Sequence, residues 1–344
     1  MMPAIAVADA LKAEGALVTF LGTADRAEAE LVPEAGYEID FVDVSGMDRR
    51  NPLKAAAALA KAAAALPGSR RILRSRRATA LLGGGGYVAG PAGLAAASMG
   101  IPIVLTEADS HLGLTNRVLA SRAERVCLAF PIEGRNGPRY VVTGRPVSGA
   151  IAGSDRAAAR ERFGLHADER CVLVVGGSLG ARSINDCAVE ALAGDHCVIH
   201  VSGHRDHQRV EQALAAHGSP RGYDLLAFEK GLGEVLAACD LVVGRAGGSI
   251  FELCAAGRPA VLVPYPHATG DHQRENARWM ERAGAAVVLA DEDLSPDLLR
   301  ATVDSILTEP GRLQRMSAAA TALARPNAAR DVAAEVLRAG RSAP

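Results

Sequence analysis

The sequence has few aromatic residues and almost no net charge, and each shortage excludes a class of partner. Phe, Tyr and Trp make up 3% of the 344 residues, which argues against stacking platforms for single-stranded nucleic acid. The formal net charge is -1, so any anionic partner must be held by a local basic patch. The sequence also lacks an apolar run of 18 residues and the basic-then-apolar start of a signal peptide. We therefore expect a cytoplasmic protein, either free or at a membrane surface.

Cysteine is scarce and is not arranged for metal binding. None of the six cysteines forms a CxxC pair, so the sequence predicts neither a zinc ribbon nor a redox motif, and we expect no metal or cofactor. Most of them lie in apolar stretches, which is typical of small core residues in a reducing compartment. The six are Cys127, Cys171, Cys187, Cys197, Cys239 and Cys254.

Apolar residues, in contrast, reach 49%, and they alternate between short β-branched runs and Ala-rich stretches. This alternation predicts parallel sheets covered by helices, and its length predicts an α/β protein of two Rossmann-like domains. Predicted strands are 17–21, 39–42, 79–82, 103–106, 126–129, 140–142, 171–175, 197–201, 223–227, 241–243, 260–263 and 286–289. Gly and Pro interrupt the pattern at 144–153, so we place domains at 1–146 and 147–325. A C-terminal helix within 326–344 is expected to pack on the first domain.

The beginning of the chain departs from a Rossmann pattern. Met1-Met2-Pro3 leads directly into a predicted helix, 4–13, whereas such a domain opens with a strand and a glycine turn. That first strand normally lies in mid-sheet, so its absence predicts a gap with unpaired strand edges. We expect that the N-terminal strand and first glycine loop are missing and that the gene starts upstream.

Two glycine-rich segments each lead from a predicted strand into a helix. They are Gly83–Pro91 (GGGGYVAGP) and Gly176–Arg182 (GGSLGAR). Glycine lets backbone N–H groups approach a ligand, and a helix start favours an anion. A flexible turn is the alternative for the first segment, and a chance match is the alternative for the second. Both positions favour phosphate binding.

Two later segments are rich in polar groups suited to sugars. In Arg245–Glu252 (RAGGSIFE), Glu252 is suited to accept both hydroxyls of a ribose, although Ser249 and Glu252 also match a helix capping box. Pro264–Asn276 carries His, Gln and Asn side chains that suit sugar hydroxyls. Simple N-capping of the following helix by Asp271 is the alternative there.

Two further segments offer a base and a basic face. Thr106–His111 follows a strand and supplies Glu107, Asp109 and His111 as candidate bases, against the alternative of an exposed polar loop. Five arginines interleave with Ile72 and Leu73, which predicts a helix face on anionic lipid or an ordinary solvated face. They are Arg70, Arg71, Arg74, Arg76 and Arg77.

In this order, the motifs resemble glycosyltransferase family 28, over nearly the whole chain. Further matches are Leu21-Gly22-Thr23, Gly113–Arg117 with Asn116, Ala129-Phe130-Pro131, Asn185 and Ala255-Ala256-Gly257. The resemblance implies a GT-B fold, in which two Rossmann-like domains face a cleft. It implies transfer of N-acetylglucosamine from UDP-GlcNAc to the 4-hydroxyl of MurNAc in lipid I, giving lipid II for peptidoglycan at the cytoplasmic face of the bacterial membrane. It also implies peripheral attachment to that membrane, with other cell-wall synthesis proteins as further partners.

The resemblance also implies residue roles. Ser178, with Leu179 and Gly180, would contact the UDP diphosphate, and Glu252 the ribose beside Gly248 and Ser249. Gln273 and Asn276 would hold the GlcNAc hydroxyls. The acceptor diphosphate would meet Gly84, Gly85, Gly86 and Tyr87, with Asn116 and Arg145 completing the predicted substrate contacts. The reaction would be an inverting single displacement.

The sequence departs from the family at three points. The opening glycine loop with its His is missing, the family's His-Glu-Gln-Asn reads Thr106-Glu107-Ala108-Asp109, and Arg145 stands near the place of a family arginine. Two alternatives therefore stay open. One is an inactive homologue that still binds a UDP-sugar, and the other is a related transferase or epimerase for another nucleotide sugar.

Overall fold

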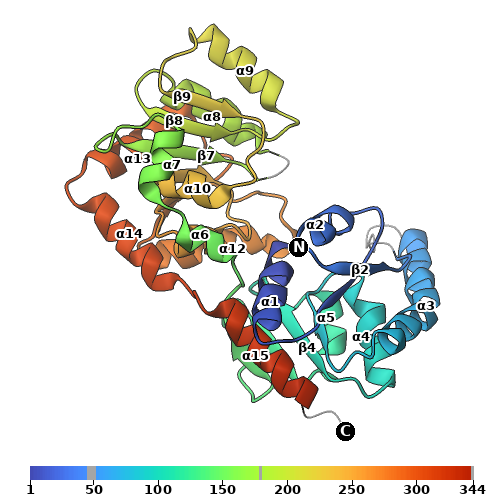
Figure 1. Ribbon diagram of the computed structural model, residues 1–344. Coiled ribbons are helices and arrows are strands. Elements are labelled where there is room, and N and C mark those ends of the chain that lie inside the picture. Colours follow the sequence, from blue (N-terminus) through green and yellow to red (C-terminus); the bar gives the residue numbers. More distant parts are fainter. Residues whose placement is uncertain (45–51, 178–179, 342–344) are drawn as a thin grey trace. The chain divides into compact units, whose positions relative to one another are not determined.

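The chain divides into two compact units. The structure is a computed structural model that describes residues 1–44, 52–177 and 180–341 (Figure 1). Unit 1 is Met1–Ser148 with Arg325–Pro344, and unit 2 is Gly149–Ala324. The chain therefore leaves unit 1, builds unit 2 and returns to finish unit 1 with its last helix.

Unit 1 alternates strands and helices. Its strands are Thr19–Gly22 (β1), Glu38–Phe41 (β2), Leu81–Gly83 (β3), Ile103–Glu107 (β4), Arg125–Leu128 (β5) and Tyr140–Val142 (β6). Its helices are Met2–Ala13 (α1), Glu28–Glu34 (α2), Pro52–Ser75 (α3), Ala89–Ser98 (α4), Leu114–Leu119 (α5) and Ala328–Arg341 (α15).

The strands described in unit 1 form two separate parallel sheets. One has the order β1-β2 and the other β3-β4-β5-β6. Among the described residues, no strand joins these two sheets. Helix α1 packs on both sides of this break, because Ile5 and Ala8 join a cluster with the first sheet while Val7 and Leu11 join one with the second.

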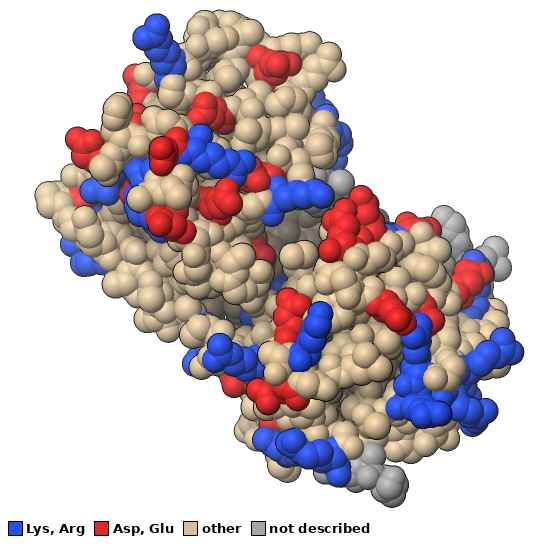
Figure 2. Space-filling view, in the orientation of Figure 1, with Lys and Arg blue, Asp and Glu red and all other residues tan. Residues whose placement is uncertain are grey.

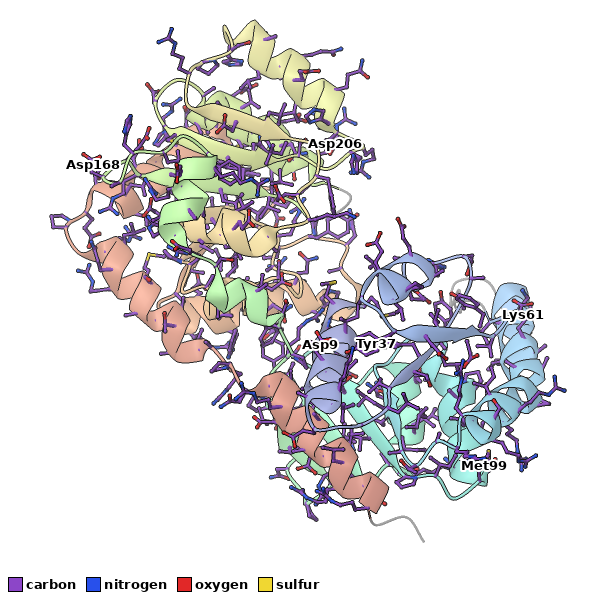
Figure 3. All side chains as sticks on the ribbon, viewed as in Figure 1. Asp9, Tyr37, Lys61, Met99, Asp168 and Asp206 are labelled. Atoms are coloured by element: carbon purple, nitrogen blue, oxygen red, sulfur yellow. The ribbon has the colours of Figure 1, made fainter. Side chains whose placement is uncertain are left out.

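Helices cover both faces of the four-stranded sheet. On one face, α1 and α15 pack together, and Val332 and Val336 of α15 meet Val104 of β4. On the other face, α3, α4 and α5 contribute to a cluster around Ile103 and Leu105. At the smaller sheet, Tyr37 donates a 2.6 Å hydrogen bond from its hydroxyl to Asp9 of α1 (Figure 3). Burial and this contact raise the pKa of Tyr37 to about 12.

Unit 2 repeats the alternation with a larger sheet. Its strands are Cys171–Val175 (β7), Cys197–Val201 (β8), Tyr223–Leu226 (β9), Leu241–Gly244 (β10), Ala260–Leu262 (β11) and Ala286–Val288 (β12). Its helices are Gly149–Gly153 (α6), Arg156–Arg162 (α7), Arg182–Leu192 (α8), His207–Ala216 (α9), Leu232–Ala238 (α10), Ile250–Ala255 (α11), His272–Arg282 (α12), Pro296–Thr308 (α13) and Arg312–Leu323 (α14), with a 3-10 turn at Thr269–Asp271.

The sheet of unit 2 is parallel, with the order β12-β11-β10-β7-β8-β9. Its central strands are continuous apolar runs because both of their faces are buried, as in β7 (Cys-Val-Leu-Val-Val). One face packs against α8, α9, α13 and α14, and α10 lies against β7 on the other. These arrangements confirm the predicted α/β class and two Rossmann-like domains, and each predicted strand overlaps an observed one.

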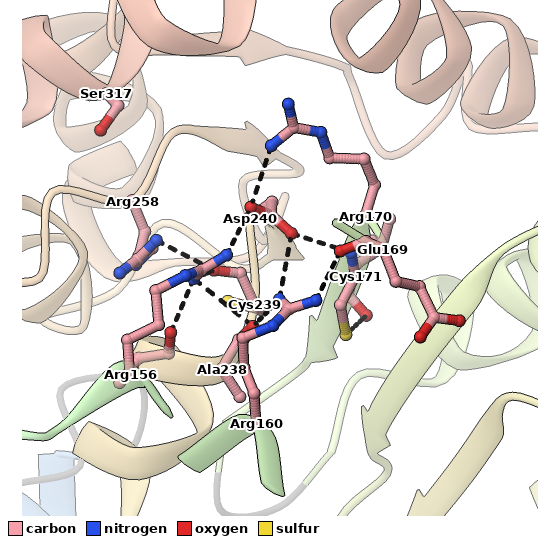
Figure 4. Close-up of polar contacts among 12 residues, drawn as sticks. Arg156, Arg160, Glu169, Arg170, Cys171, Ala238, Cys239, Asp240, Arg258 and Ser317 are labelled. Carbon is pink, nitrogen blue, oxygen red and sulfur yellow. Dashed lines mark hydrogen bonds and ion pairs between the residues drawn. The ribbon is translucent and has the colours of Figure 1, made fainter. Parts of the chain in front are cut away.

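Asp240, just before β10, gathers arginines at the end of the sheet opposite its glycine loops (Figure 4). Its carboxylate lies 2.7 Å from Arg156 Nη2 and 3.6 Å from Arg160 Nη1, and it accepts a hydrogen bond from the Cys171 backbone N–H (3.0 Å). The same arginines donate to carbonyls at the C-terminus of α10, including Ala238. Cations are favourable at a helix C-terminus, so the cluster ties α7, α10 and β7 together.

The cysteines are free thiols, as expected of core residues. Five are buried, and Cys197 is partly exposed. Among the described residues, no helix is long and apolar enough to cross a membrane, and no group of His, Cys, Asp and Glu is arranged to hold a metal ion.

Candidate functional site

The order of strands in unit 2 reverses direction at its centre. From β7 the chain proceeds to β8 and β9 on one side, and then returns to β10 on the other side of β7. In open parallel sheets, ligands bind outside the carboxyl ends of the strands where the winding reverses in this way. Two predicted segments of unit 2 lie at this switch point, Gly176–Arg182 after β7 and Arg245–Glu252 after β10.

The glycine turn after β7 is closely packed. A Cβ on Gly176 would lie 2.4 Å from the Ala181 backbone nitrogen, and one on Gly180 would lie 2.3 Å from the Ser202 carbonyl oxygen. Gly180 also has φ +77°, which side chains rarely adopt. These glycines allow the backbone to turn sharply into α8, whose N-terminus favours an anion. The predicted diphosphate contacts Ser178 and Leu179 lie outside the described residues.

The loop after β10 approaches β7 equally closely. A Cβ on Gly244 would lie 2.5 Å from the Val175 carbonyl oxygen. Ser249 occupies the N-cap of α11, but its side chain makes no capping hydrogen bond. The serine half of a capping box is therefore not formed, which favours the ligand-binding interpretation of Glu252, one turn into α11 and partly exposed. Gly248 and Ser249 are partly exposed beside it.

Gln273 and Asn276, the predicted sugar contacts on α12, both touch neighbouring loops. The Gln273 Oε1 accepts a hydrogen bond from the Tyr265 backbone N–H (3.0 Å). Asn276 is 2% exposed, and its Nδ2 donates to the Ala246 carbonyl (2.9 Å). Asn276 therefore holds the β10–α11 loop, whereas the partly exposed Gln273 is better placed for a sugar. Asp271 makes no side-chain cap for α12, so the capping alternative is not realised.

Sequence reasoning missed a polar cluster at the same edge. Arg245, directly after β10, donates to Asp291 Oδ1 (2.5 Å) and to Ser183 Oγ (2.8 Å), and Ser183 donates to the same carboxylate (2.7 Å). The guanidinium also lies 5.4 Å from the centroid of the Tyr265 ring. The cluster joins the ends of β10 and β12 to the start of α8. The signal in the sequence that could have revealed this cluster is an arginine, Arg245, directly after an apolar strand.

An aromatic pair at this edge was also missed. The rings of His204 and Phe228, which follow β8 and β9, stack with centroids 5.5 Å apart. Phe228 is an exposed large apolar side chain. A flat exposed ring at the carboxyl edge of the sheet that carries the glycine turns is suited to stacking on a nucleobase. The only sequence signal is that both residues follow predicted strands.

In unit 1, the first glycine segment packs against helix α5. Gly85 and Gly86 have φ of +79° and +73°. Thr115 Oγ1 donates to the Gly86 carbonyl (2.7 Å), and a Cβ on Gly85 would lie 3.7 Å from Asn116 Nδ2. Gly84 and Gly86 are exposed, while Tyr87 packs beneath the Arg26 guanidinium, 5.8 Å from its ring centroid.

Glu107 organises the loop that follows β4. Its carboxylate, in a residue 7% exposed, accepts hydrogen bonds from the Asp109 and Gly113 backbone N–H groups (3.2 and 2.8 Å) and from Asn116 Nδ2 (2.9 Å). These contacts make Glu107 an anchor of this loop. Asp109 and His111 are partly exposed, and Arg145 is near enough to the Met1 amino group to lower its pKa, after the larger effect of burial.

The basic segment differs from its predicted arrangement. Leu73 is buried in the core around Ile103, and Ile72 packs against the cluster of Val42 and Val44, so neither faces outward to enter a lipid surface. The prediction of an apolar face here is wrong, because α3 turns these residues toward the sheets. Arg76 pairs with Glu38 and with Asp40. The remaining four arginines are exposed, and Figure 2 shows basic side chains gathered at the end of α3.

Comparison with known protein families accounts for most of the chain. Residues 1–128 match the model of the glycosyltransferase family 28 N-terminal domain, and residues 171–335 match that of the family's C-terminal domain. These two stretches carry the glycine segments of unit 1 and unit 2 respectively.

Curated relatives match along almost their whole length. Those of Moorella thermoacetica and Salinibacter ruber are among the relatives named UDP-N-acetylglucosamine–N-acetylmuramyl-(pentapeptide) pyrophosphoryl-undecaprenol N-acetylglucosamine transferase. That of Moorella thermoacetica is 40% identical, covering 98% of this chain and 95% of the relative. That of Salinibacter ruber is also 40% identical, covering 97% of this chain and 92% of the relative.

Solved structures give the same relationship. The crystal structure of Acinetobacter baumannii MurG has 30% identity and a TM-score of 0.77, covering 98% of this chain and 95% of that chain. A putative UDP-N-acetylglucosamine 2-epimerase from Listeria monocytogenes has a TM-score of 0.74 at 14% identity, covering 98% and 92% of the two chains. The second likeness shows a shared fold alone.

Proposed function

Because the chain belongs to glycosyltransferase family 28, we propose that it transfers N-acetylglucosamine from UDP-GlcNAc to the 4-hydroxyl of MurNAc in lipid I. The observation that carries this proposal is the 40% identity to a transferase of that name across 95% of the relative's length. The product would be lipid II, the disaccharide precursor of peptidoglycan.

In this proposal, unit 2 holds the donor at its switch point. The turn from β7 into α8 would receive the diphosphate, because backbone N–H groups and the helix dipole favour negative charge there. Glu252 would accept the ribose hydroxyls, Phe228 would stack on the uracil, and Gln273 would contact the sugar. As the diphosphate leaves, the same dipole stabilises the charge that develops on it.

Unit 1 would hold the acceptor. The exposed glycines Gly84 and Gly86 would bind the acceptor diphosphate, on a loop that Thr115 holds from α5. The 4-hydroxyl would attack the anomeric carbon in one displacement and lose its proton to a base. Asp109 and His111 are the candidates for that base, since the Glu107 carboxylate already accepts two hydrogen bonds from its loop and one from Asn116 of α5.

A transfer assay with a matched binding assay tests the function. The chain is incubated with radiolabelled UDP-GlcNAc and a short-chain lipid I analogue, and UDP affinity is measured separately by calorimetry. Labelled disaccharide product is expected. UDP binding without product would support the inactive UDP-sugar-binding homologue, and turnover of UDP-GlcNAc to a 2-epimer would support the epimerase alternative.

We also infer that the end of α3 meets an anionic membrane surface. The proposed acceptor is linked to undecaprenol, an apolar lipid, so the protein must work at the membrane where that lipid lies. Arg70, Arg71 and Arg74 are exposed on α3, and no acidic partner is described for them. Basic residues near an anionic membrane contribute about 1 kcal/mol each.

Replacing Arg70, Arg71 and Arg74 together with glutamine is expected to weaken binding to phosphatidylglycerol vesicles by about 100-fold, following from about 1 kcal/mol per arginine. Vesicle sedimentation at fixed ionic strength measures this. The matched control replaces three exposed arginines of unit 2, Arg221, Arg282 and Arg315, and should bind as the wild type does. Equal losses in both variants would contradict the assignment to α3.

A further inference from the structure

A hydrogen-bonded row of buried polar side chains, called here the polar row, runs through unit 2 from β9 to α8. It contains Tyr223, His200 and Asn185, of which His200 and Asn185 are fully buried. The Tyr223 hydroxyl lies 2.9 Å from His200 Nδ1, and His200 Nε2 lies 3.0 Å from Asn185 Oδ1. Buried polar groups are retained where they are fully hydrogen-bonded, because an unpaired one is costly.

The direction of each hydrogen bond in the polar row follows from the partners of Asn185, at its far end. Asn185 Nδ2 lies 2.9 Å from the Ser202 carbonyl oxygen and 3.2 Å from Asp206 Oδ2, and both can only accept. The amide oxygen therefore faces His200, whose Nε2 must carry the proton, and Tyr223 donates to Nδ1. Burial, with a smaller contribution from His207, lowers the pKa of His200 to about 3, so the ring stays neutral.

The polar row ends directly beneath the glycine turn at the switch point. A Cβ on Gly180 would lie 2.3 Å from the Ser202 carbonyl oxygen, 3.1 Å from Asp206 Oδ2 and 3.4 Å from Asn185 Nδ2. Gly180 thus rests on the groups that Asn185 holds together, and Asp206 (Figure 3) is one of them. A shift of the Asn185 amide would move the surface on which this turn lies.

We propose that His200 is a positioning residue for the donor diphosphate, acting through Asn185 on the turn at Gly180. This rests on the proposed function in one respect, that the turn binds the diphosphate of UDP. Tyr223 determines which ring nitrogen of His200 carries the proton, and the N–H of His200 then orients the Asn185 amide. The Asn185 amide in turn holds the Ser202 carbonyl and the Asp206 carboxylate, against which Gly180 packs. His200 itself touches no substrate and transfers no proton.

Two substitutions at His200 separate this role from general core stability. In His200→Gln, the side-chain amide can still donate to Asn185 from the position of Nε2. In His200→Asn, the shorter amide can accept from Tyr223 at the position of Nδ1 but loses the donor to Asn185. We expect His200→Asn to raise KM for UDP-GlcNAc and Kd for UDP about 10-fold, in line with the loss of one buried hydrogen bond.

The expected pattern is specific to the donor. His200→Gln should stay within about threefold of the wild type, and the KM for the lipid I analogue should be unchanged in both variants. Tyr223→Phe, a milder change that is expected to fold, should raise the donor constants in the same direction by a smaller factor. The control is Ile199→Val, because Ile199 is buried next to His200 on β8 but is not part of the polar row. It should lower stability without changing the donor constants.

Calorimetry of UDP binding and steady-state kinetics are run together on all these proteins. Unchanged UDP affinity in His200→Asn and Tyr223→Phe, with the wild type binding UDP, would overturn the inference alone. Equal effects of His200→Gln and His200→Asn would also overturn it, because they would indicate stability without positioning. A wild type that binds no UDP and transfers no sugar would overturn the proposed function and this inference together.

Discussion

Replacing Asp240 with alanine is expected to lower the free energy of unfolding of unit 2 by about 3–5 kcal/mol, the range for removing one partner of a buried ion pair. Asp240 is 6% exposed, and the Arg160 side chain beside it is equally buried. Without the carboxylate, the Arg160 guanidinium would keep only backbone carbonyls as partners and would be a buried charge without a counter-ion. The Cys171 N–H would also lose its acceptor.

Urea unfolding measures this effect within the intact chain. The single tryptophan, Trp279, lies on α12, so its fluorescence reports on unit 2. Asp195→Ala is the matched control, because Asp195 is exposed and pairs with Arg300, and such surface pairs contribute about 0–1 kcal/mol. If both variants unfold at the same urea concentration, Asp240 does not have the central role that its contacts indicate.

Glu252→Gln is expected to weaken UDP binding by about 100-fold, since hydrogen bonds to a charged group contribute about 1.5–3 kcal/mol. The carboxylate would accept both ribose hydroxyls, whereas the amide offers one acceptor and one donor. The kcat/KM for UDP-GlcNAc should fall by a similar factor. Glutamine also serves in a capping box, so a loss of affinity at unchanged stability would distinguish ligand binding from helix capping.

A double-mutant cycle with a modified ligand makes this test specific. UDP lacking both ribose hydroxyls should bind the wild type weakly, and Glu252→Gln should lower that residual affinity little further. If the variant weakens the modified ligand as much as UDP itself, Glu252 acts elsewhere than on the ribose, and its proposed role is wrong.

The periodic parts of the chain were predictable from the sequence, because each depends on neighbouring residues. Runs such as Cys171–Val175 are typical of parallel strands buried on both faces, and the glycine segments follow such runs. The strand order that brings the segments after β7 and β10 to one switch point was not predicted. Glu252 and Gln273 lie in polar segments that the sequence already singled out, and the family resemblance added their expected roles.

The errors and omissions concern contacts between distant parts of the sequence. Ile72 and Leu73 resemble an outward apolar stripe, and only the packing of α3 against both sheets shows that they face inward. In the sequence Arg76 is one of several neighbouring arginines, and only the structure shows its ion pairs with Glu38 and Asp40. Each of these depends on tertiary structure, which one-dimensional periodicity does not encode.

The return of the chain to unit 1 has a consequence for its synthesis. Residues 149–324 are contiguous and can fold as soon as they leave the ribosome, whereas unit 1 needs α15, which is made last. Until then, the apolar surface of α1 and β4 that receives Val332 and Val336 is uncovered. We therefore expect nascent chains that end before residue 325 to contain a protease-resistant unit 2 and a protease-sensitive unit 1, and to be the form that chaperones bind.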